Sequence, residues 1–301
     1  NLFACSDGGL HRTTNGGGSW QELQNGMNIT QYYKISTSDA DSVKYLAGAQ
    51  DNGTHMRING SSFDRVLGGD GMDNAIDLQN PNIMYGSSQY GNFNKSTNGG
   101  NNFNAAFDIS NVLPMGNGAW VTPIELDPLN STTVYIGYTR VYRSTDAGVN
   151  FSAVSNVLTG DDIQMLYVPR ANTDHVYARV SNSQFLYRST NGAQNFSLIA
   201  SIPGSGTVTG VAVDDADEQH IWVTRSGYSA GQKVYESFNG GGSWTNISGN
   251  LPNLPVNCIL YTDTANDGVY IGTDAGVYYR NNDLADWMPY MHGLPNVIVN
   301  D

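Results

Sequence analysis

The chain has 301 residues, of which only 14% are charged, and its formal net charge is −13. This acidic excess repels the phosphates of nucleic acids and anionic membrane surfaces, so neither is expected as a partner. No apolar run has the length that spans a bilayer, which argues against membrane insertion, and the abundant Gly, Asn, Ser and Thr are typical of short strands joined by tight turns.

From the N-terminus, the first predicted elements are an apolar strand at residues 2–5 and an eight-residue turn motif at residues 13–20. The motif has the pattern Ser/Thr-x-Asn/Asp-x-Gly-x-polar-aromatic, with Ala193 replacing the Gly once. It returns at residues 96–103, 144–151, 189–196 and 237–244, and two weaker copies end at Phe63 and Trp287. The closing aromatics lie 40 to 48 residues apart, which indicates a repeated structural unit.

Each unit predicts four strands. An apolar inner strand, such as residues 124–127, is followed by a strand with an aromatic anchor, and two more strands flank the turn motif. The anchors are Phe3, Tyr45, Tyr85, Tyr135, Tyr177, Trp222 and Tyr270. Four strands in such a period form one propeller blade, and a blade buries both faces only between neighbours. We therefore predict an all-β, seven-bladed β-propeller with four-stranded antiparallel blades.

The two ends of the chain indicate how the ring closes. The first unit begins at its anchor strand and lacks an inner strand, while residues 293–301 are similar to residues 251–257, which lead into an inner strand. We expect residues 1–301 to form one domain, closed by residues 293–301 pairing with the N-terminal blade. The chain starts with Asn1, so we expect it to be the ordered part of a larger secreted protein.

The repeated turn motif has a structural explanation. Its Asn or Asp side chain is expected to accept hydrogen bonds from backbone N–H groups two residues on, and its Gly adopts a positive φ. The closing aromatic anchors the turn in apolar packing. Five full copies argue against a unique active site there. They supply the pairs Asn15 and Trp20, Asn98 and Phe103, Asp146 and Phe151, Asn191 and Phe196, and Asn239 and Trp244.

These motifs resemble the Asp-box, or BNR, repeats of a propeller superfamily that includes sialidases, xyloglucanases and sortilin-type receptors. Residues 48–53 (Gly-Ala-Gln-Asp-Asn-Gly) and 68–73 (Gly-Gly-Asp-Gly-Met-Asp) look like those of sortilin-like propellers in secreted and cell-surface proteins of Bacteroidetes. The resemblance implies a secreted or cell-surface location and export by type IX secretion. It does not imply one function, because members range from hydrolases to receptors.

Ligands of propellers usually bind at the face opposite the turn motifs. Candidates near the start of inner strands are Asp70, Asp73, Trp120, Asp161 and Asp162. Candidates near the connections that follow the anchor strands are Gln50, Asp51, Gln89, Tyr90, Arg140 and Tyr228. Exposed aromatics beside carboxylates and amides suit sugar or peptide recognition. The alternative is that the acidic residues are solvated and the aromatics cover blade edges.

The sequence gives little support for a metal site or a redox site. Asp70 and Asp73 flank a Gly-rich turn and are weak candidates for Ca²⁺, although a structural turn explains them as well. No cofactor is expected. The two cysteines, Cys5 and Cys258, lie in apolar strand patterns and form either two buried free thiols or a disulfide between the chain ends.

A glycosidase remains an alternative to a binding protein. Xyloglucanase-type enzymes use two aspartates across a cleft between two propellers, and their first aspartate lies in a turn resembling those at Asp7 and Asp274. Asp70 is the third candidate. A sialidase is disfavoured because Arg12 and its repeats precede a turn motif and so lie on the wrong face.

The sequence thus favours a non-catalytic recognition or scaffold propeller that binds an extracellular glycan or protein and is joined to other domains of the same polypeptide. A xyloglucanase-type hydrolase is the first alternative, and a spacer in a surface filament or adhesin is the second.

Overall fold

The computed structural model describes residues 1–301 except 7–8, 24, 26–29, 61, 105–116 and 182. Within this part, 26 strands and one 3-10 turn form seven antiparallel sheets, as predicted for a seven-bladed β-propeller. Five sheets have four strands and two have three in the residues described. No helix of the described part is long and apolar enough to span a membrane.

The N-terminal sheet contains β1 (Leu2–Ser6), β2 (Gly9–Thr13) and β3 (Gln21–Glu22). Blade 1 contains β4 (Tyr32–Ser38), β5 (Asp41–Ala49), β6 (Gly53–Asn59) and β7 (Ser62–Leu67). Blade 2 contains β8 (Asn74–Ile76), β9 (Met84–Ser88), the 3-10 turn η1 (Gln89–Gly91) and β10 (Asn92–Ser96). Blade 3 contains β11 (Ile124–Leu126), β12 (Val134–Gly137), β13 (Val141–Ser144) and β14 (Ser152–Ala153).

Blade 4 contains β15 (Ile163–Tyr167), β16 (Val176–Val180), β17 (Tyr187–Ser189) and β18 (Ser197–Leu198). Blade 5 contains β19 (Val208–Val213), β20 (Ile221–Arg225), β21 (Val234–Ser237) and β22 (Thr245–Asn246). Blade 6 contains β23 (Val256–Thr262), β24 (Gly268–Thr273), β25 (Gly276–Arg280) and β26 (Met288–Pro289).

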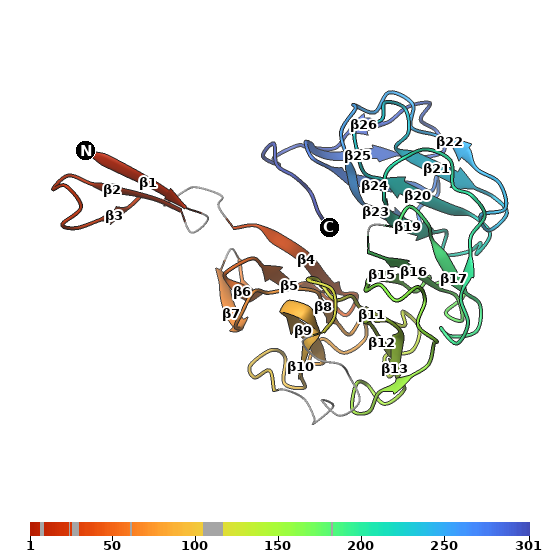
Figure 1. The fold of residues 1–301 in the computed structure, drawn as a ribbon, viewed down its shortest axis with the longest axis horizontal. Helices are drawn as coiled ribbons and strands as arrows, with labels where there is room; N and C mark the ends of the chain where they lie inside the picture. The colour runs from red at the N-terminus through yellow and green to blue at the C-terminus, as the bar shows by residue number, and fades with distance from the viewer. Residues whose placement is uncertain (7–8, 24, 26–29, 61, 105–116, 182) are drawn as a thin grey trace.

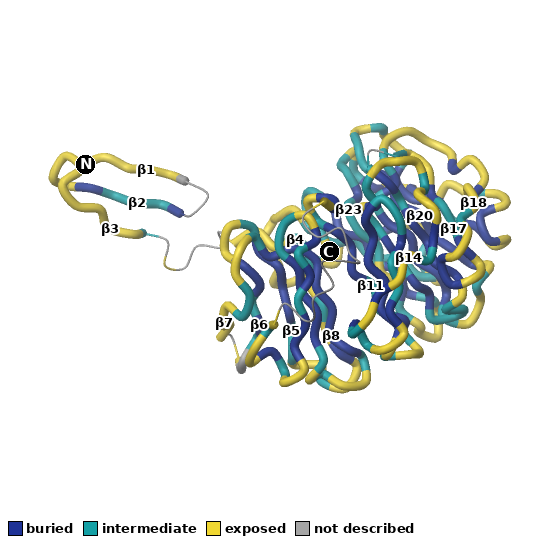
Figure 2. Tube along the Cα trace, turned by 60° about the horizontal axis from the view of Figure 1, so that its bottom comes forward, coloured by how far each residue is buried: buried dark blue, intermediate teal, exposed yellow. Residues whose placement is uncertain are grey.

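Blades 1 to 6 are arranged around a common axis, whereas the N-terminal sheet extends away from them (Figure 1). Five clusters of buried side chains each join two consecutive blades, from blades 1 and 2 through to blades 5 and 6. Predicted anchors form their centres, since Tyr85, Tyr135, Tyr177 and Trp222 are almost completely buried. Figure 2 shows this buried interior and the contrasting exposure of β1 and β3.

The chain ends differ from the expected pairing. Among the described residues β1 pairs with β2 alone, and residues 293–301 form no strand. Instead the Val299 N–H donates to the Thr273 carbonyl (2.9 Å) and the Ile35 N–H donates to Asp301 (2.9 Å). Closure of the ring by residues 293–301 therefore stays a prediction. Both cysteines are free thiols, and Cys5 is exposed rather than buried.

The turn motifs form the predicted side-chain to backbone hydrogen bonds, but these bonds reach further along the chain than predicted. In blade 3, Asp146 Oδ1 accepts the N–H of Asn150 (2.8 Å), four residues on instead of two. The reason is that Ala147 and Gly148 both have positive φ (57° and 77°) and curl the chain back over the carboxylate. The backbone and side chain of Asn150 lower the pKa of Asp146 to about 2. Equivalent bonds run from Asn102, Asn195 and Ser243 to their own motifs.

Candidate functional site

Four side chains from blades 1 to 3 meet on the face opposite the turn motifs. The Trp120 indole N–H donates to the Tyr33 hydroxyl (3.1 Å), which in turn donates to Gln50 Oε1 (2.9 Å). The Tyr90 and Trp120 rings pack edge to face, with centroids 5.2 Å apart and planes at 80°. We call Tyr33, Gln50, Tyr90 and Trp120 the aromatic–amide cluster. Its two outer rings remain open to solvent, with Tyr90 47% and Trp120 40% exposed.

Strand order explains this placement. Tyr90 lies in η1, immediately before β10, and the turn motif of blade 2 begins at Ser96, where β10 ends. The cluster and the motifs therefore lie at opposite ends of the same strand. Two backbone bonds fix Tyr90 to the next blade, because its N–H donates to the Trp120 carbonyl (3.4 Å) and its carbonyl accepts from the Gly118 N–H (3.0 Å).

Asp70 fastens the polar side of the cluster. Its Oδ1 accepts the Asp51 backbone N–H (2.6 Å), and its Oδ2 accepts the Gln89 side-chain amide. These are hydrogen bonds to a charged acceptor, which are stronger than those between neutral groups. Because Gln89 directly precedes Tyr90, the Asp70 carboxylate helps to hold the aromatic loop in position.

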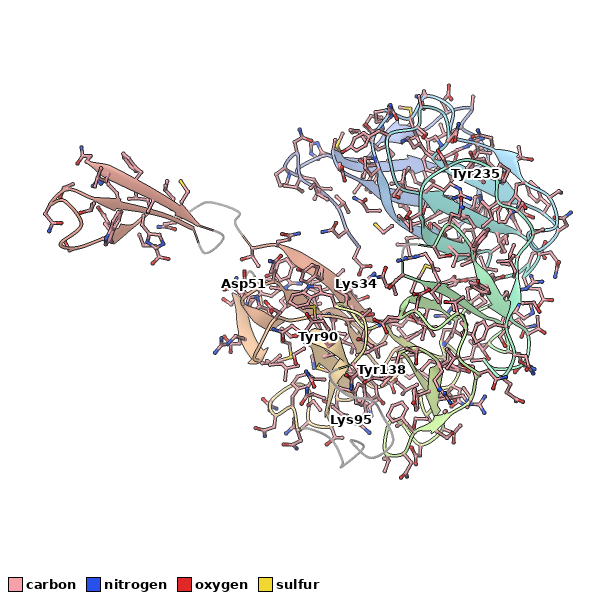
Figure 3. All side chains as sticks on the ribbon, in the orientation of Figure 1. Lys34, Asp51, Tyr90, Lys95, Tyr138 and Tyr235 are labelled. Carbon is pink, nitrogen blue, oxygen red and sulfur yellow. The ribbon has the colours of Figure 1, made fainter. Side chains whose placement is uncertain are left out.

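Backbone strain coincides with the cluster. Asp51 (φ 59°) and Tyr90 (φ 61°) are non-glycine residues in the left-handed region, a conformation that costs roughly 1–3 kcal/mol and concentrates at functional sites. Both are labelled in Figure 3, on the first two blades of the ring. The Asp70 and Gly118 bonds described above oppose relaxation of this strain.

The structure brings six predicted site residues into this neighbourhood and leaves five elsewhere. Gln50, Asp51, Asp70, Gln89, Tyr90 and Trp120 belong to the cluster or contact its supports. Asp73 borders the central channel and accepts the Ile124 N–H. Arg140 lies in the turn between β12 and β13, and Asp162 lies just before β15. Asp161 accepts from the Thr159 hydroxyl, and the Tyr228 hydroxyl donates to Asp274.

The predicted catalytic aspartates lie in separate environments. Asp274 lies in the β24–β25 turn of blade 6, where Asn257 Nδ2 (3.1 Å) and the Tyr228 hydroxyl (3.4 Å) donate to its two oxygens. Asp70 lies between β7 and β8 and is bonded as described. Asp7 is outside the described residues. The two described candidates, Asp70 and Asp274, are thus hydrogen-bonded to different partners in different parts of the ring.

A second polar region lines the central channel, and sequence reasoning found only one of its members. Lys34 forms an ion pair with Asp301 (2.8 Å), and both border a cavity of about 420 Å³ together with Asp73 and Glu125. Burial raises the pKa of Asp73 to about 6, against the opposing influence of Lys34 and of the Ile124 N–H. Burial also raises the pKa of Glu125 to about 8, so this carboxyl is mostly protonated at neutral pH.

Metal binding receives no support from the described residues. Asp73 accepts backbone N–H groups at both oxygens, from Asn74 (2.8 Å) and Ile124 (3.0 Å), whereas Asp70 binds Gln89 and Asp51. The two weak Ca²⁺ candidates thus face different partners. In the part of the chain described, no three His, Cys, Asp or Glu side chains are grouped to hold a metal ion.

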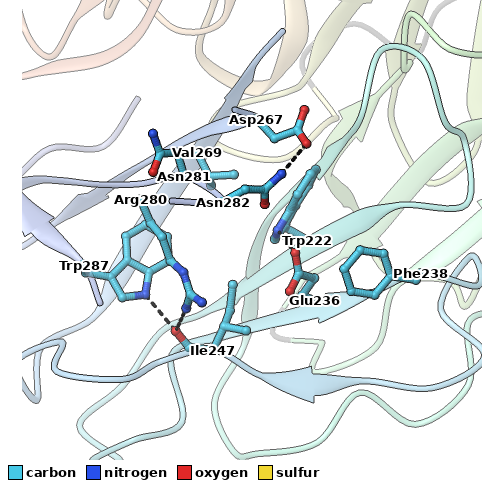
Figure 4. A pocket seen from close by; sticks show the side chains of 10 residues that line it. All are labelled: Trp222, Glu236, Phe238, Ile247, Asp267, Val269, Arg280, Asn281, Asn282 and Trp287. Carbon is cyan, nitrogen blue, oxygen red and sulfur yellow. Dashed lines mark hydrogen bonds between the residues drawn. The ribbon is translucent and has the colours of Figure 1, made fainter. Parts of the chain in front are cut away.

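A small pocket between blades 5 and 6 marks a departure from the repeat (Figure 4). In blades 2 to 4, the basic residue that precedes the turn motif donates a hydrogen bond to a backbone carbonyl in the turn motif of the next blade. These bonds run from Lys95 to Ala147, from Arg143 to Gly192 (3.1 Å) and from Arg188 to Gly240 (3.0 Å). In blade 5 this position is Glu236, which cannot donate to a carbonyl.

Glu236 instead organises the aromatic wall of that pocket. Its Oε1 accepts from Trp222 Nε1 and pairs with His220 Nε2, both at 3.0 Å. Burial of the His220 ring opposes its protonation, but bonds and charges from Glu236 and Asp214 outweigh this and raise its pKa. The His220 ring also stacks on Phe238. The pocket encloses about 120 Å³, enough for only a few water molecules.

Comparison with known proteins defines the fold and leaves the function open. No protein-family model and no curated protein sequence matches the chain. Among solved structures, the GH74 xyloglucanase of Xanthomonas campestris superposes with a TM-score of 0.70 at 16% identity, covering 91% of this chain and 49% of that enzyme. YCF48 bound to D1 peptide superposes with a TM-score of 0.65 at 15% identity, covering 87% of this chain and 83% of that chain.

A third neighbour is the extracellular domain of a one-component system from B. thetaiotaomicron, with a TM-score of 0.59 at 14% identity over 90% of this chain and 35% of that one. The chain spans half or less of the length of the GH74 enzymes that it matches. Enzymes and proteins of other kinds therefore share this fold, and the identities are too low to transfer any activity.

Proposed function

We propose that the chain is a non-catalytic recognition propeller of a secreted or cell-surface protein, and that the aromatic–amide cluster binds a carbohydrate. The observation that carries this proposal is the pair of exposed rings, Tyr90 and Trp120, held by backbone and side-chain bonds next to Gln50. The extracellular domain of a one-component system and the xyloglucanase among the structural neighbours support an extracellular role and a polysaccharide ligand. Type IX secretion and attachment to further domains of the same polypeptide belong to the same proposal.

The chemistry of the cluster suits sugars better than it suits hydrolysis. The C–H face of a pyranose packs against an exposed aromatic ring, while amides and carboxylates bind its hydroxyl groups. Because the cluster is preorganised by Asp70 and by the Tyr33 hydroxyl, little ordering is needed when a ligand binds.

The placement of the candidate aspartates supports a glycoside hydrolase less well than a binding protein. Glycosidases place two carboxyl groups about 5–10 Å apart across the scissile bond. The described candidates Asp70 and Asp274 are engaged by partners within different blades. A filament spacer without a ligand gives no reason for strained, solvent-exposed aromatics at one face, and we rank it last.

The proposal is tested by polysaccharide pull-down and glycan-array binding, run beside a reducing-sugar release assay on the same panel. Binding without release is the expected result. Release of sugar that Asp70→Asn or Asp274→Asn abolishes would establish the hydrolase alternative. Binding of peptides but of no glycan would replace the proposed ligand with a protein, as in the neighbour bound to a peptide.

A further inference from the structure

The N-terminal sheet has the features of a blade that lacks its packing partners. Phe3 occupies the anchor position and is 61% exposed, whereas the anchor Tyr135 of blade 3 is 2% exposed. Trp20 closes the first turn motif and is 47% exposed, whereas Trp287 in blade 6 is 1% exposed. The first turn motif is nevertheless formed, because the Ser19 N–H donates to Asn15 Oδ1 (2.9 Å). The sheet is therefore folded but unpacked.

The C-terminal residues already make the first bond of a seventh inner strand. In blade 4, the inner strand begins at Ile163, whose N–H donates to the Tyr138 carbonyl of blade 3 (2.7 Å). Val299 repeats this bond with the Thr273 carbonyl of blade 6 (2.9 Å). Tyr138 and Thr273 each lie three residues after the anchor of their blade. Val299 thus stands where a seventh blade would begin.

A second bond places the same segment against blade 1. Asp73 in blade 2 accepts the N–H of Ile124 on the inner strand of blade 3 (3.0 Å). Asp301 accepts the N–H of Ile35 on the inner strand of blade 1 in the same way (2.9 Å). Residues 299–301 therefore bridge blades 6 and 1 at the position of an inner strand, and their outward edge has no strand beside it in the described residues.

Outside this segment lies a groove of about 750 Å³, which we call the closure groove. Its lining includes Tyr45 and Phe63, the anchor and closing aromatic of blade 1, with Ile35, Val297 and Ile298. The closing aromatics of blades 3 and 6, Phe151 and Trp287, are 6% and 1% exposed, whereas Phe63 is 46% exposed. An apolar groove beside an open strand edge is unfavourable in water, so we expect it to be covered.

We propose that the N-terminal sheet of the same chain docks in the closure groove as the outer three strands of the seventh blade, with β1 paired to residues 299–301. The groove exposes the closing aromatic Phe63, and the N-terminal sheet exposes both its anchor Phe3 and its closing aromatic Trp20. Only nine residues separate Glu22 from Tyr32, and such a short tether gives an effective concentration in the millimolar range, which favours docking within one chain over exchange between copies.

The repeat also fixes the register of this pairing. In blade 6, Cys258 lies opposite Gly272, two residues after the anchor Tyr270. Cys5 lies two residues after Phe3, and Asp301 corresponds to Cys258 when Val299 is aligned with Val256. The docked sheet therefore places Cys5 directly opposite Asp301. Directly opposite residues of antiparallel strands have Cα atoms about 4.5–5.5 Å apart, within the range of a disulfide.

The test is the variant Asp301→Cys in a Cys258→Ser background, oxidised and analysed by non-reducing electrophoresis and peptide mass spectrometry. An intramolecular disulfide between position 301 and Cys5 is expected in a monomer. The matched control Asn300→Cys, one residue out of register, should form little of it. A disulfide-linked dimer would overturn the proposal in favour of blade exchange between copies.

A second measurement avoids changing Asp301, whose contacts with Lys34 and Ile35 the first variant removes. The rate at which Cys5 reacts with a thiol reagent is compared in the Cys258→Ser protein and in the same protein with Phe3→Ala. Docking predicts at least tenfold protection of Cys5 that Phe3→Ala removes. Equal and fast reaction in both proteins would show that the groove does not hold this sheet.

Discussion

Trp120 donates its indole N–H to the hydroxyl of Tyr33, although 87 residues separate the two in the chain. This bond joins blade 3 to blade 1, and the Tyr33 hydroxyl in turn donates to Gln50 Oε1. The exposed rings of the aromatic–amide cluster are thus held from three blades, which is the preorganisation that the proposed function requires.

Removing the Tyr33 hydroxyl tests this connection. Tyr33→Phe keeps the ring but removes both hydrogen bonds, and each such bond contributes about 0.5–1.5 kcal/mol. We expect the free energy of unfolding to fall by about 1–2 kcal/mol in urea denaturation and glycan affinity to weaken severalfold. Tyr228→Phe, at an exposed tyrosine of blade 5, is the control and should change neither value by much.

The charge of Asp70 is expected to hold the loop that carries Tyr90 in position and not to take part in catalysis. Asp70→Asn replaces a charged acceptor of the Asp51 N–H and the Gln89 amide by a neutral one, which should lower stability by about 1 kcal/mol. Isothermal titration should show weaker glycan binding in this variant. Unchanged binding would mean that the Gln89 loop holds Tyr90 without help from Asp70.

His220 should stabilise the folded protein more at low pH than at high pH. Its folded-state pKa is raised above 6.5, so the contribution is fully present below pH 6.5 and is lost as the pH rises through the folded value. His220→Gln should therefore destabilise the protein by more at pH 5.5 than at pH 8.5, as measured by chemical denaturation at both values. An equal loss at the two pH values would contradict the pairing with Glu236 and Asp214.

Glu125 in the channel gives a second pH experiment, in which the variant is expected to gain stability instead of losing it. Its pKa is raised from 4.5 to about 8, so the folded state binds a proton more tightly than the unfolded state does. Stability should fall as the pH rises from 4.5 to 8 and then level off. One pKa unit corresponds to about 1.4 kcal/mol, so Glu125→Gln should exceed the parent protein in stability at pH 9 by more than about 1 kcal/mol. Its advantage should disappear at pH 4.5.

The fold was predictable because the period and the turn chemistry are local. Anchors such as Tyr135 and motif residues such as Asp146 occupy the places that the repeat assigns to them. The predicted span of the motif bond was wrong by two residues, because Ala147 as well as Gly148 has a positive φ and only the glycine was expected to have one. The exposure of Cys5 was also missed, since strand periodicity does not reveal that β1 lies apart from the ring.

The candidate site was predictable in part. Gln50, Tyr90 and Trp120 follow from their place at the ends of strands, because such connections gather on one face of a propeller. Tyr33 was missed, since its role depends on a contact with Trp120 from two blades away. Its place next to the start of an inner strand was the available signal. Glu125 and Lys34 were missed because inner strands were treated only as apolar.

The central claim is that the aromatic–amide cluster recognises a glycan, and affinity measured for Trp120→Ala tests it most directly. With the best polysaccharide from the binding panel, this variant should lose at least tenfold in affinity while its melting temperature falls by only a few degrees. Phe238→Ala is the matched control, an exposed aromatic of a turn motif on the opposite face, and it should bind like the parent protein. Full affinity in Trp120→Ala, or an equal loss in Phe238→Ala, would contradict the account.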